Sequence, residues 1–155
     1  MKEKLQDIKK YFWSSVILLT LMSLTFIAMP AADYVDEGKV KIFLAAIGAI
    51  FWVTLVGGYV LWFMAYRLNK TIIQEKIRLN LFSNRIVSIA DGMFIGGAAV
   101  LFLAAATKKM EGFLPYIILT ILTLSVNLHC MFNGNIYRTI TKKTRRKDDE
   151  KKDAQ

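Results

Sequence analysis

Two ionisable side chains, Asp91 and His129, interrupt long apolar stretches of this 155-residue chain. Asp91 follows Arg85 by six residues and His129 precedes Arg138 by nine, which is about 9 and 13 Å along a helix at 1.5 Å per residue. Both arginines lie on the membrane face that carries most of the basic residues, so the acid and the imidazole are expected at similar depth on neighbouring helices. A charged group in hydrocarbon costs at least ~2.5–3.5 kcal/mol, so we expect both side chains to face the protein interior and each other.

Further polar side chains accompany each of these two residues. Ser88 precedes Asp91 by about one helical turn. Ser125, His129 and Asn133 recur every four residues, which gives the last apolar segment one continuous polar face. The sequence therefore predicts a candidate intramembrane polar site made of Asp91, His129, Ser88, Ser125 and Asn133.

Three interpretations of this predicted site are open. The first is a structural clasp that fixes the register of two helices, since interhelical hydrogen bonds orient helices even though each contributes well under 2 kcal/mol. The second is a proton- or ion-responsive site, because a histidine beside a carboxylate changes charge in the physiological range. The third is recognition of a ligand or partner, which intramembrane charges often serve. Asn127 and Cys130 add polarity on a neighbouring line of the same helix.

Enzymatic chemistry finds little support in the sequence. It has no pair of intramembrane carboxylates for general acid–base catalysis, no recognisable Ser-His-Asp arrangement and no glycine loop for phosphate. Cys130 directly follows His129, so their side chains diverge by about 100° on a helix. One cysteine and one histidine also exclude an intrachain disulfide and a four-ligand Cys/His zinc site. We expect a non-enzymatic protein with no cofactor and no metal site.

Four apolar segments must position the polar residues. They cover residues 12–29, 42–66, 86–107 and 113–135. Each is in or near the ~17–25 residues that cross the hydrocarbon as a helix. The chain is 55% hydrophobic with a mean hydropathy of +0.39, above the roughly 45–50% of a soluble domain. The prediction is an all-α, four-helix transmembrane bundle in residues 1–141, followed by a charged cytoplasmic tail in residues 142–155.

The distribution of lysine and arginine predicts the orientation. Seventeen of the 21 lie in the N-terminal segment, in the connection between the second and third spans, or after the fourth span. Because cytoplasmic loops retain the basic residues, we expect a multi-pass protein of the cell membrane with both termini in the cytoplasm. The net charge of +9 is assigned to topology and anionic lipid, not nucleic acid, because the basic residues flank apolar segments.

The connections refine this picture. Residues 67–85 mix apolar and basic side chains, which predicts that the second helix continues as an amphipathic segment on the cytoplasmic side. Ser83 or Asn84 is the expected N-cap of the third span. The short connection 108–112 makes spans three and four antiparallel neighbours. Small residues predict close helix packing, within the chain or in a homodimer, at Gly57, Gly58, Gly92 and Gly96.

Two stretches of the C-terminal half carry a resemblance. The first combines Phe82-Ser83-Asn84-Arg85 with Ile89-Ala90-Asp91, and the second runs from Leu128-His129-Cys130-Met131-Phe132-Asn133-Gly134 to Tyr137. Over roughly residues 82–137 the chain resembles uncharacterised small multi-span membrane proteins of Gram-positive bacteria. The resemblance implies a bacterial plasma membrane and singles out the same polar residues, but it names no activity.

The sequence favours a non-enzymatic membrane protein that acts through protein–protein contacts in the membrane, as an accessory subunit or an immunity-type protein. The alternative is a small dimeric proton-coupled transporter or channel that uses Asp91 and His129, although the two halves show no clear repeat and no interrupted half-helices. An intramembrane enzyme acting on lipid is the least favoured. The expected partners are anionic lipid at the cytoplasmic face and another membrane protein or a second copy of the chain, with no nucleic acid.

Overall fold

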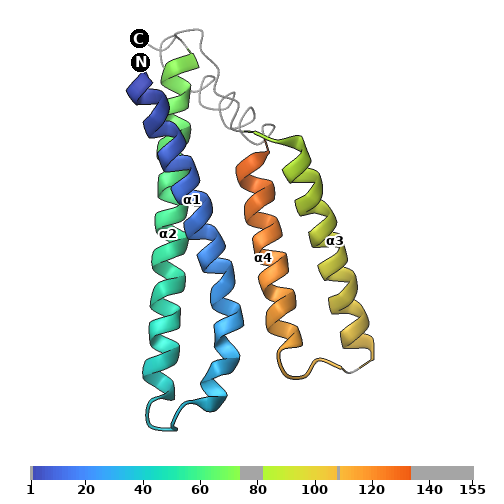
Figure 1. The fold of residues 1–155 in the computed structure, drawn as a ribbon. Helices are drawn as coiled ribbons and strands as arrows, with labels where there is room; N and C mark the ends of the chain where they lie inside the picture. The colour runs from blue at the N-terminus through green and yellow to red at the C-terminus, as the bar shows by residue number, and fades with distance from the viewer. Residues whose placement is uncertain (1, 74–81, 108, 134–155) are drawn as a thin grey trace, which may run out of the picture.

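Four α-helices and one 3-10 helix make up the part of the chain that the computed structural model describes, residues 2–73, 82–107 and 109–133 (Figure 1). In chain order the elements are α1 (Lys2–Ala28), η1 (Met29–Tyr34), α2 (Val40–Ile73), α3 (Asn84–Ala106) and α4 (Leu114–Phe132). All four α-helices are long and apolar enough to cross a membrane. The predicted all-α, four-helix transmembrane architecture is confirmed.

The first two helices are longer than the last two, with 27 residues in α1 and 23 in α3. α2 has 34 residues and α4 has 19, which is about 51 and 28 Å of helix. α1 begins ten residues before the predicted first span and α2 ends seven residues after the predicted second span, so this pair projects past the end of α4 (Figure 1). The predicted continuation of the second helix therefore holds through Ile73. Residues 74–81 of that connection and the charged tail, residues 142–155, lie outside the described residues.

The start of α3 and the end of α4 are joined by a local network. Ser83 is the N-cap of α3, as predicted: its Oγ accepts a hydrogen bond from the backbone N–H of Ile86 at 3.4 Å. The backbone N–H of Ser83 donates to the carbonyl of Phe132 at 3.3 Å. At the opposite end, the turn before α4 contains Gly112 with φ at 60°, and Pro115 follows in the first turn of α4. These contacts hold α3 and α4 side by side as an antiparallel hairpin.

The helices lie in the spatial order α2, α1, α4, α3 (Figure 1). α1 packs against both α2 and α4, whereas α3 packs mainly against α4. In the apolar 18-residue stretch of each spanning helix, 33% of the residues are buried in α1 and 28% in α4. The buried share is 11% in both α2 and α3. α1 and α4 are therefore the central helices, and α3 lies at the edge with most of its surface uncovered.

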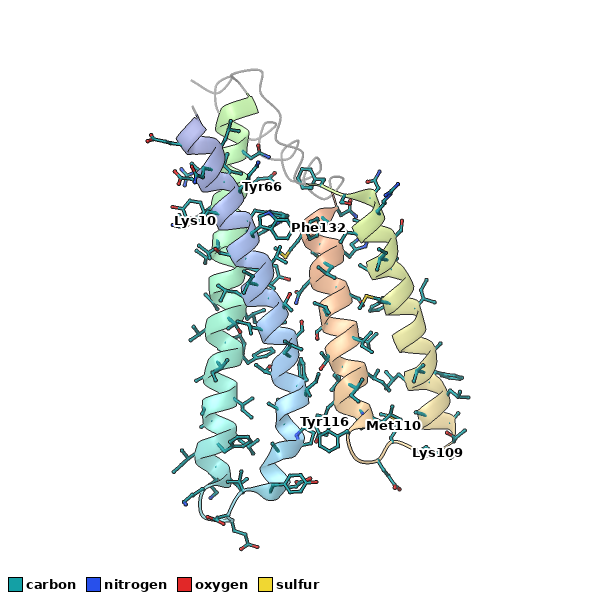
Figure 2. All side chains as sticks on the ribbon, in the orientation of Figure 1. Lys10, Tyr66, Lys109, Met110, Tyr116 and Phe132 are labelled. Carbon is teal, nitrogen blue, oxygen red and sulfur yellow. The ribbon has the colours of Figure 1, made fainter. Side chains whose placement is uncertain are left out.

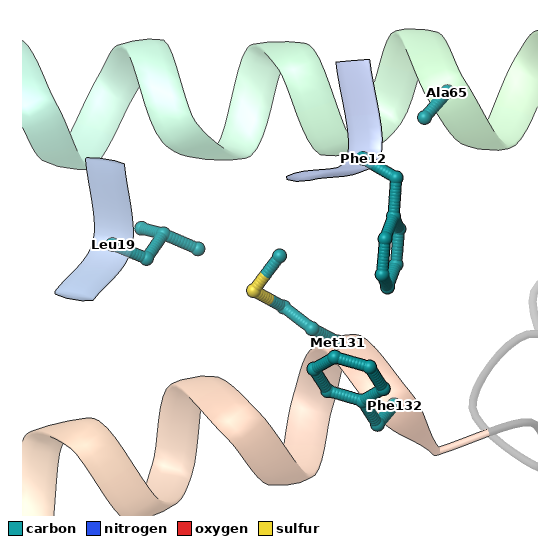
Figure 3. Close-up of a cluster of buried hydrophobic side chains, with 5 residues drawn as sticks. All are labelled: Phe12, Leu19, Ala65, Met131 and Phe132. Atoms are coloured by element: carbon teal, nitrogen blue, oxygen red, sulfur yellow. The ribbon is translucent and has the colours of Figure 1, made fainter. Parts of the chain in front are cut away.

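A compact apolar cluster joins the α1–α2 hairpin to the α3–α4 hairpin (Figure 3). Its buried members are Phe12, Leu19, Ala65, Met131 and Phe132. The rings of Phe12 and Phe132 meet edge to face, with centroids 5.2 Å apart. Ile86 and Val87 add the first turn of α3 to the cluster. The cluster thus fixes the position of the α3–α4 hairpin against α1 and α2 at one end of the helices.

The glycines of α2 lie where α1 approaches most closely. A Cβ at Gly58 would be 2.7 Å from Cγ of Leu19, and one at Gly57 would be 3.4 Å from Cδ1 of Leu18. A real Cβ does not approach a neighbour as closely as 2.7 Å, so only glycine fits at position 58 without a shift of a buried leucine. Gly57 and Gly58 are packing residues within the chain.

The glycines of α3 divide between two faces of the helix. A Cβ at Gly97 would be 3.1 Å from Cδ2 of Leu122 on α4, whereas nothing lies within 4 Å at Gly92 or Gly96. The intramolecular contact expected at Gly92 and Gly96 is therefore made at Gly97 instead. Small residues occur on two faces of α3. Gly97 faces α4, whereas Gly92 and Gly96 lie on the exposed side of the helix. Packing of Gly92 and Gly96 against a second chain stays a prediction.

Candidate functional site

The structure brings Asp91 and His129 together. Oδ1 of Asp91 on α3 lies 2.5 Å from Nδ1 of His129 on α4. The hydrogen bond between Ser83 and Phe132 holds the two helix ends side by side, and this alignment puts the acid and the imidazole within reach of each other. A contact at this distance is a hydrogen bond to a charged or chargeable group, the stronger kind in proteins.

Asn133 extends this pair into a chain of three side chains. Its Nδ2 lies 2.9 Å from Nε2 of His129. In this arrangement the neutral imidazole donates from Nδ1 to the Asp91 carboxylate and accepts at Nε2 from the Asn133 amide. A doubly protonated imidazole would donate from both nitrogens, so Asn133 would have to turn its amide oxygen toward Nε2. The orientation of the Asn133 amide and the protonation of His129 are thus linked.

The Asp91–His129 pair is not buried. The side chain of Asp91 is 52% exposed and that of His129 is 36% exposed. The expectation that the two residues face each other is met, but the expectation that they do so in the interior is wrong. The reason is the row-like arrangement of the helices, in which α3 packs mainly against α4 and none of the other helices in the described part of the chain covers the pair.

The two serines of the predicted site do not join the Asp91–His129–Asn133 chain. Ser125 is buried, and its hydroxyl donates to the carbonyl of Ile121 on the same helix at 2.6 Å. Ser88 lies on the exposed side of α3, one turn before Asp91. The polar stripe of α4 is therefore split, with its last two members in the site and its first member bonded to its own backbone.

The hydrogen bonds that join the hairpins come from Asn127, which the spacing arguments left outside the predicted site. Its Oδ1 accepts from the hydroxyl of Tyr59 at 3.0 Å. Its Nδ2 donates to the carbonyl of Leu19 at 3.4 Å and to Oγ of Ser23 at 3.3 Å. This buried amide therefore contacts both α1 and α2 from α4. A carboxamide in the middle of an apolar span was the available signal, because such a group needs partners in hydrocarbon.

The chemistry open to the site follows from its donors and acceptors. Both nitrogens of His129 are engaged, one by a carboxylate and one by an amide, so the chain can hold or pass a proton between its members. Among the described residues, no group of three or more His, Cys, Asp and Glu side chains is arranged to hold a metal ion. The exposed flank of the pair is also open to a polar group from another molecule.

Comparisons with known proteins do not classify this chain, so its classification rests on its architecture. No family model matches the chain, and no curated protein or solved structure matches it. The resemblance of residues 82–137 to small Gram-positive membrane proteins therefore stays a prediction. With four apolar helices of spanning length, the chain is a multi-pass membrane protein.

Proposed function

We propose that this chain is a non-enzymatic membrane protein that acts by contacting another membrane protein within the bilayer, through the exposed side of the α3–α4 hairpin. The observation that carries the proposal is the half-exposed Asp91–His129 pair. Ionisable groups that face lipid cost at least ~2.5–3.5 kcal/mol each by insertion scales, and a covering protein surface removes that exposure. An accessory subunit of a membrane complex and an immunity-type protein that intercepts a membrane-active toxin both fit this mode of action.

The depth of Asp91 favours a protein partner over lipid headgroups. Asp91 lies seven residues after Asn84, the first residue of α3, which is about 10 Å along the helix. Long lysine and arginine side chains reach the interface from such a depth, but an aspartate is too short. The engagement of both nitrogens of His129 by neighbouring side chains weighs against a role as a general base.

Photocrosslinking in living cells tests the proposal. We place p-benzoylphenylalanine at Ile95, one turn from Asp91 on the exposed side of α3, and at Val53 on the exposed side of α2 as the matched control. We expect discrete adducts from Ile95 that disappear when Asp91→Leu is added, and none from Val53. Equal adducts at both positions, or none at Ile95, would overturn the proposal.

The Asp91–His129–Asn133 chain also supports a second candidate, a small dimeric proton-coupled transporter or channel. Three hydrogen-bonded groups that include a carboxylate and an imidazole are the parts from which membrane proton relays are built. Proton flux into proteoliposomes, followed with a pH-sensitive dye, tests this candidate. Flux that Asp91→Asn abolishes and Ser125→Ala preserves would support it. Absence of flux in the unmodified protein would exclude it.

A further inference from the structure

We infer that the partner presents a lysine or arginine side chain from a membrane-spanning helix, and that this cation binds the second oxygen of the Asp91 carboxylate. The inference rests on the proposed function, because it names the chemistry of the partner that makes the proposed contact. Three observations support it: the unengaged Oδ2 of Asp91, the charge of the Asp91–His129 pair, and the exposed apolar side chains that continue from Asp91 along α3.

Only one of the two carboxylate oxygens of Asp91 is engaged within the described part of the chain. Oδ1 contacts Nδ1 of His129, and no hydrogen bond or ion pair from the described residues reaches Oδ2. An ionised carboxylate only accepts hydrogen bonds, so a group that binds Oδ2 must be a donor. Asp91 and Asn133 already engage both nitrogens of His129. A partner at this site therefore meets an acceptor, the carboxylate of Asp91.

The charge of the pair favours a cation over an uncharged donor. With Asn133 donating to Nε2, the imidazole is neutral and the carboxylate carries the only charge. The pair thus presents one net negative charge to its surroundings. A hydroxyl or amide bound to Oδ2 would leave that charge unbalanced in the apolar part of the membrane. A lysine or arginine would both donate to Oδ2 and cancel the charge, which is how intramembrane charges are accommodated.

This chain does not supply such a cation from its own spans. No lysine or arginine occurs in the four apolar segments, residues 12–29, 42–66, 86–107 and 113–135. Arg85 precedes Asp91 by six residues, so the two side chains lie about 120° apart around α3. A second copy of the chain would bring the same spans, and they offer no cation at this depth. The cation therefore has to come from a different protein.

An exposed apolar line beside Asp91 fits a helix as the element that carries the cation. Ile95 and Phe102 follow Asp91 by four and eleven residues, so the three side chains lie within about 40° on one side of α3. Steps of four and seven residues are those at which one helix contacts another. Ile95 and Phe102 are strongly exposed, and so, on α4, is Val126, one turn before His129. A helix along this line would contact both α3 and α4.

The position of α3 leaves room for such a helix. α3 is the last helix in the row and contacts mainly α4, and Figure 2 shows side chains on its outer side with no described helix beyond them. Asp91 lies seven residues from the start of α3, about 10 Å along the helix. A lysine or arginine about seven residues inside a neighbouring span, counted from the same side of the membrane, is at the same depth.

Designed membrane peptides test the inference with a probe of known composition. Each peptide is an apolar helix of about 20 residues with tryptophan at both ends. The probe carries one lysine seven residues from its end, the spacing of Asp91 from Asn84, and two controls carry leucine or glutamate at that place. Energy transfer to the labelled full-length protein in phosphatidylcholine vesicles measures association. We expect the lysine peptide to bind at least about tenfold more tightly than either control.

Variants of Asp91 assign this preference to the carboxylate. Asp91→Asn keeps an oxygen that accepts from Nδ1 of His129 but removes the charge, so the preference for lysine should disappear. Asp91→Glu keeps the charge and should retain the preference. Asp91→Lys should reverse it, so that the glutamate peptide binds more tightly than the lysine peptide. Ser88→Ala, at an exposed position one turn from Asp91, is the matched control and should leave the preference unchanged.

The outcomes separate this inference from the proposed function, which photocrosslinking from Ile95 tests. Adducts that Asp91→Asn removes and Asp91→Glu preserves support the basic partner. Adducts that survive Asp91→Asn would overturn the basic partner and leave the proposed contact intact. An adduct of twice 17.7 kDa would do the same, because a second copy has no such cation. Equal binding of the lysine and leucine peptides would also overturn the inference. Absence of any adduct from Ile95 would overturn the proposed function and this inference with it.

Discussion

The buried amide of Asn127 allows a quantitative test of what holds the two hairpins together. Asn127→Leu keeps the shape of the side chain but removes the hydrogen bonds to Tyr59, Leu19 and Ser23. Interhelical hydrogen bonds in membranes average about 0.6 kcal/mol each and reach about 1.7. Three of them give an expected loss of about 2 kcal/mol in the free energy of unfolding. The Tyr59 hydroxyl is then left in an apolar environment without this acceptor.

Unfolding in mixed micelles, with denaturing detergent as the variable, measures this loss. The variants are Asn127→Leu, Tyr59→Phe and the double variant, and their cycle isolates the bond between the two side chains, expected at about 0.6 kcal/mol. Ser125→Ala is the matched control, since its buried hydroxyl bonds only to its own helix and should change stability by less than about 0.5 kcal/mol. If Asn127→Leu unfolds like the unmodified protein, or the cycle shows no coupling, Asn127 does not join the hairpins.

Three further predictions follow from the fold. In the same assay Gly58→Ala should lower the free energy of unfolding by about 1–3 kcal/mol because its Cβ would clash with a buried leucine, while Gly48→Ala, with open space around it, should be neutral or slightly stabilising. Ser83→Ala removes the N-cap of α3 and should cost about 0.5–2 kcal/mol, seen as faster hydrogen exchange in the first turn; unchanged exchange would refute the cap. The orientation proposed from the basic residues, with both termini in the cytoplasm, predicts that Glu111→Cys reacts with an impermeant maleimide added to intact cells and Glu3→Cys only after permeabilisation; the reverse pattern would refute the orientation.

The spans and helix ends could be predicted from the sequence because each depends on local chemistry. Apolar runs of spanning length predict transmembrane helices, and the serine at position 83 predicts a cap whatever surrounds it. The meeting of Asp91 and His129 was also predictable, since the distance of each from a flanking arginine gives its depth without knowledge of the packing.

Burial and the pairing of distant residues could not be predicted, because they depend on how the helices are arranged. Asp91 was expected in the interior, but a row of helices leaves it half-exposed where a closed bundle would have covered it. Gly92 and Gly97 are both glycines, and only the rotation of α3 about its own axis decides which of them contacts α4. The partners of Asn127 lie 68 to 108 residues away along the chain, and no local spacing relates them.

The sequence separation between Asn127 and its partners also bears on the order in which the protein is assembled. Leu19 and Ser23 are made more than one hundred residues before Asn127. Since synthesis runs from the N-terminus, the α1–α2 hairpin is in the membrane before α4 leaves the ribosome. The Ser23 hydroxyl donates to the Leu19 carbonyl of its own helix, so this hydroxyl does not depend on α4 for a hydrogen-bond partner.

α4 enters last and has the lowest hydropathy of the four spans, 1.6. Its amide finds partners only by docking against a hairpin that is already in place. Insertion of α4 and formation of the hydrogen bonds of Asn127 are therefore successive steps. A chain stalled between them would have four helices in the bilayer and two separate hairpins, the state in which a membrane protease or chaperone would meet it.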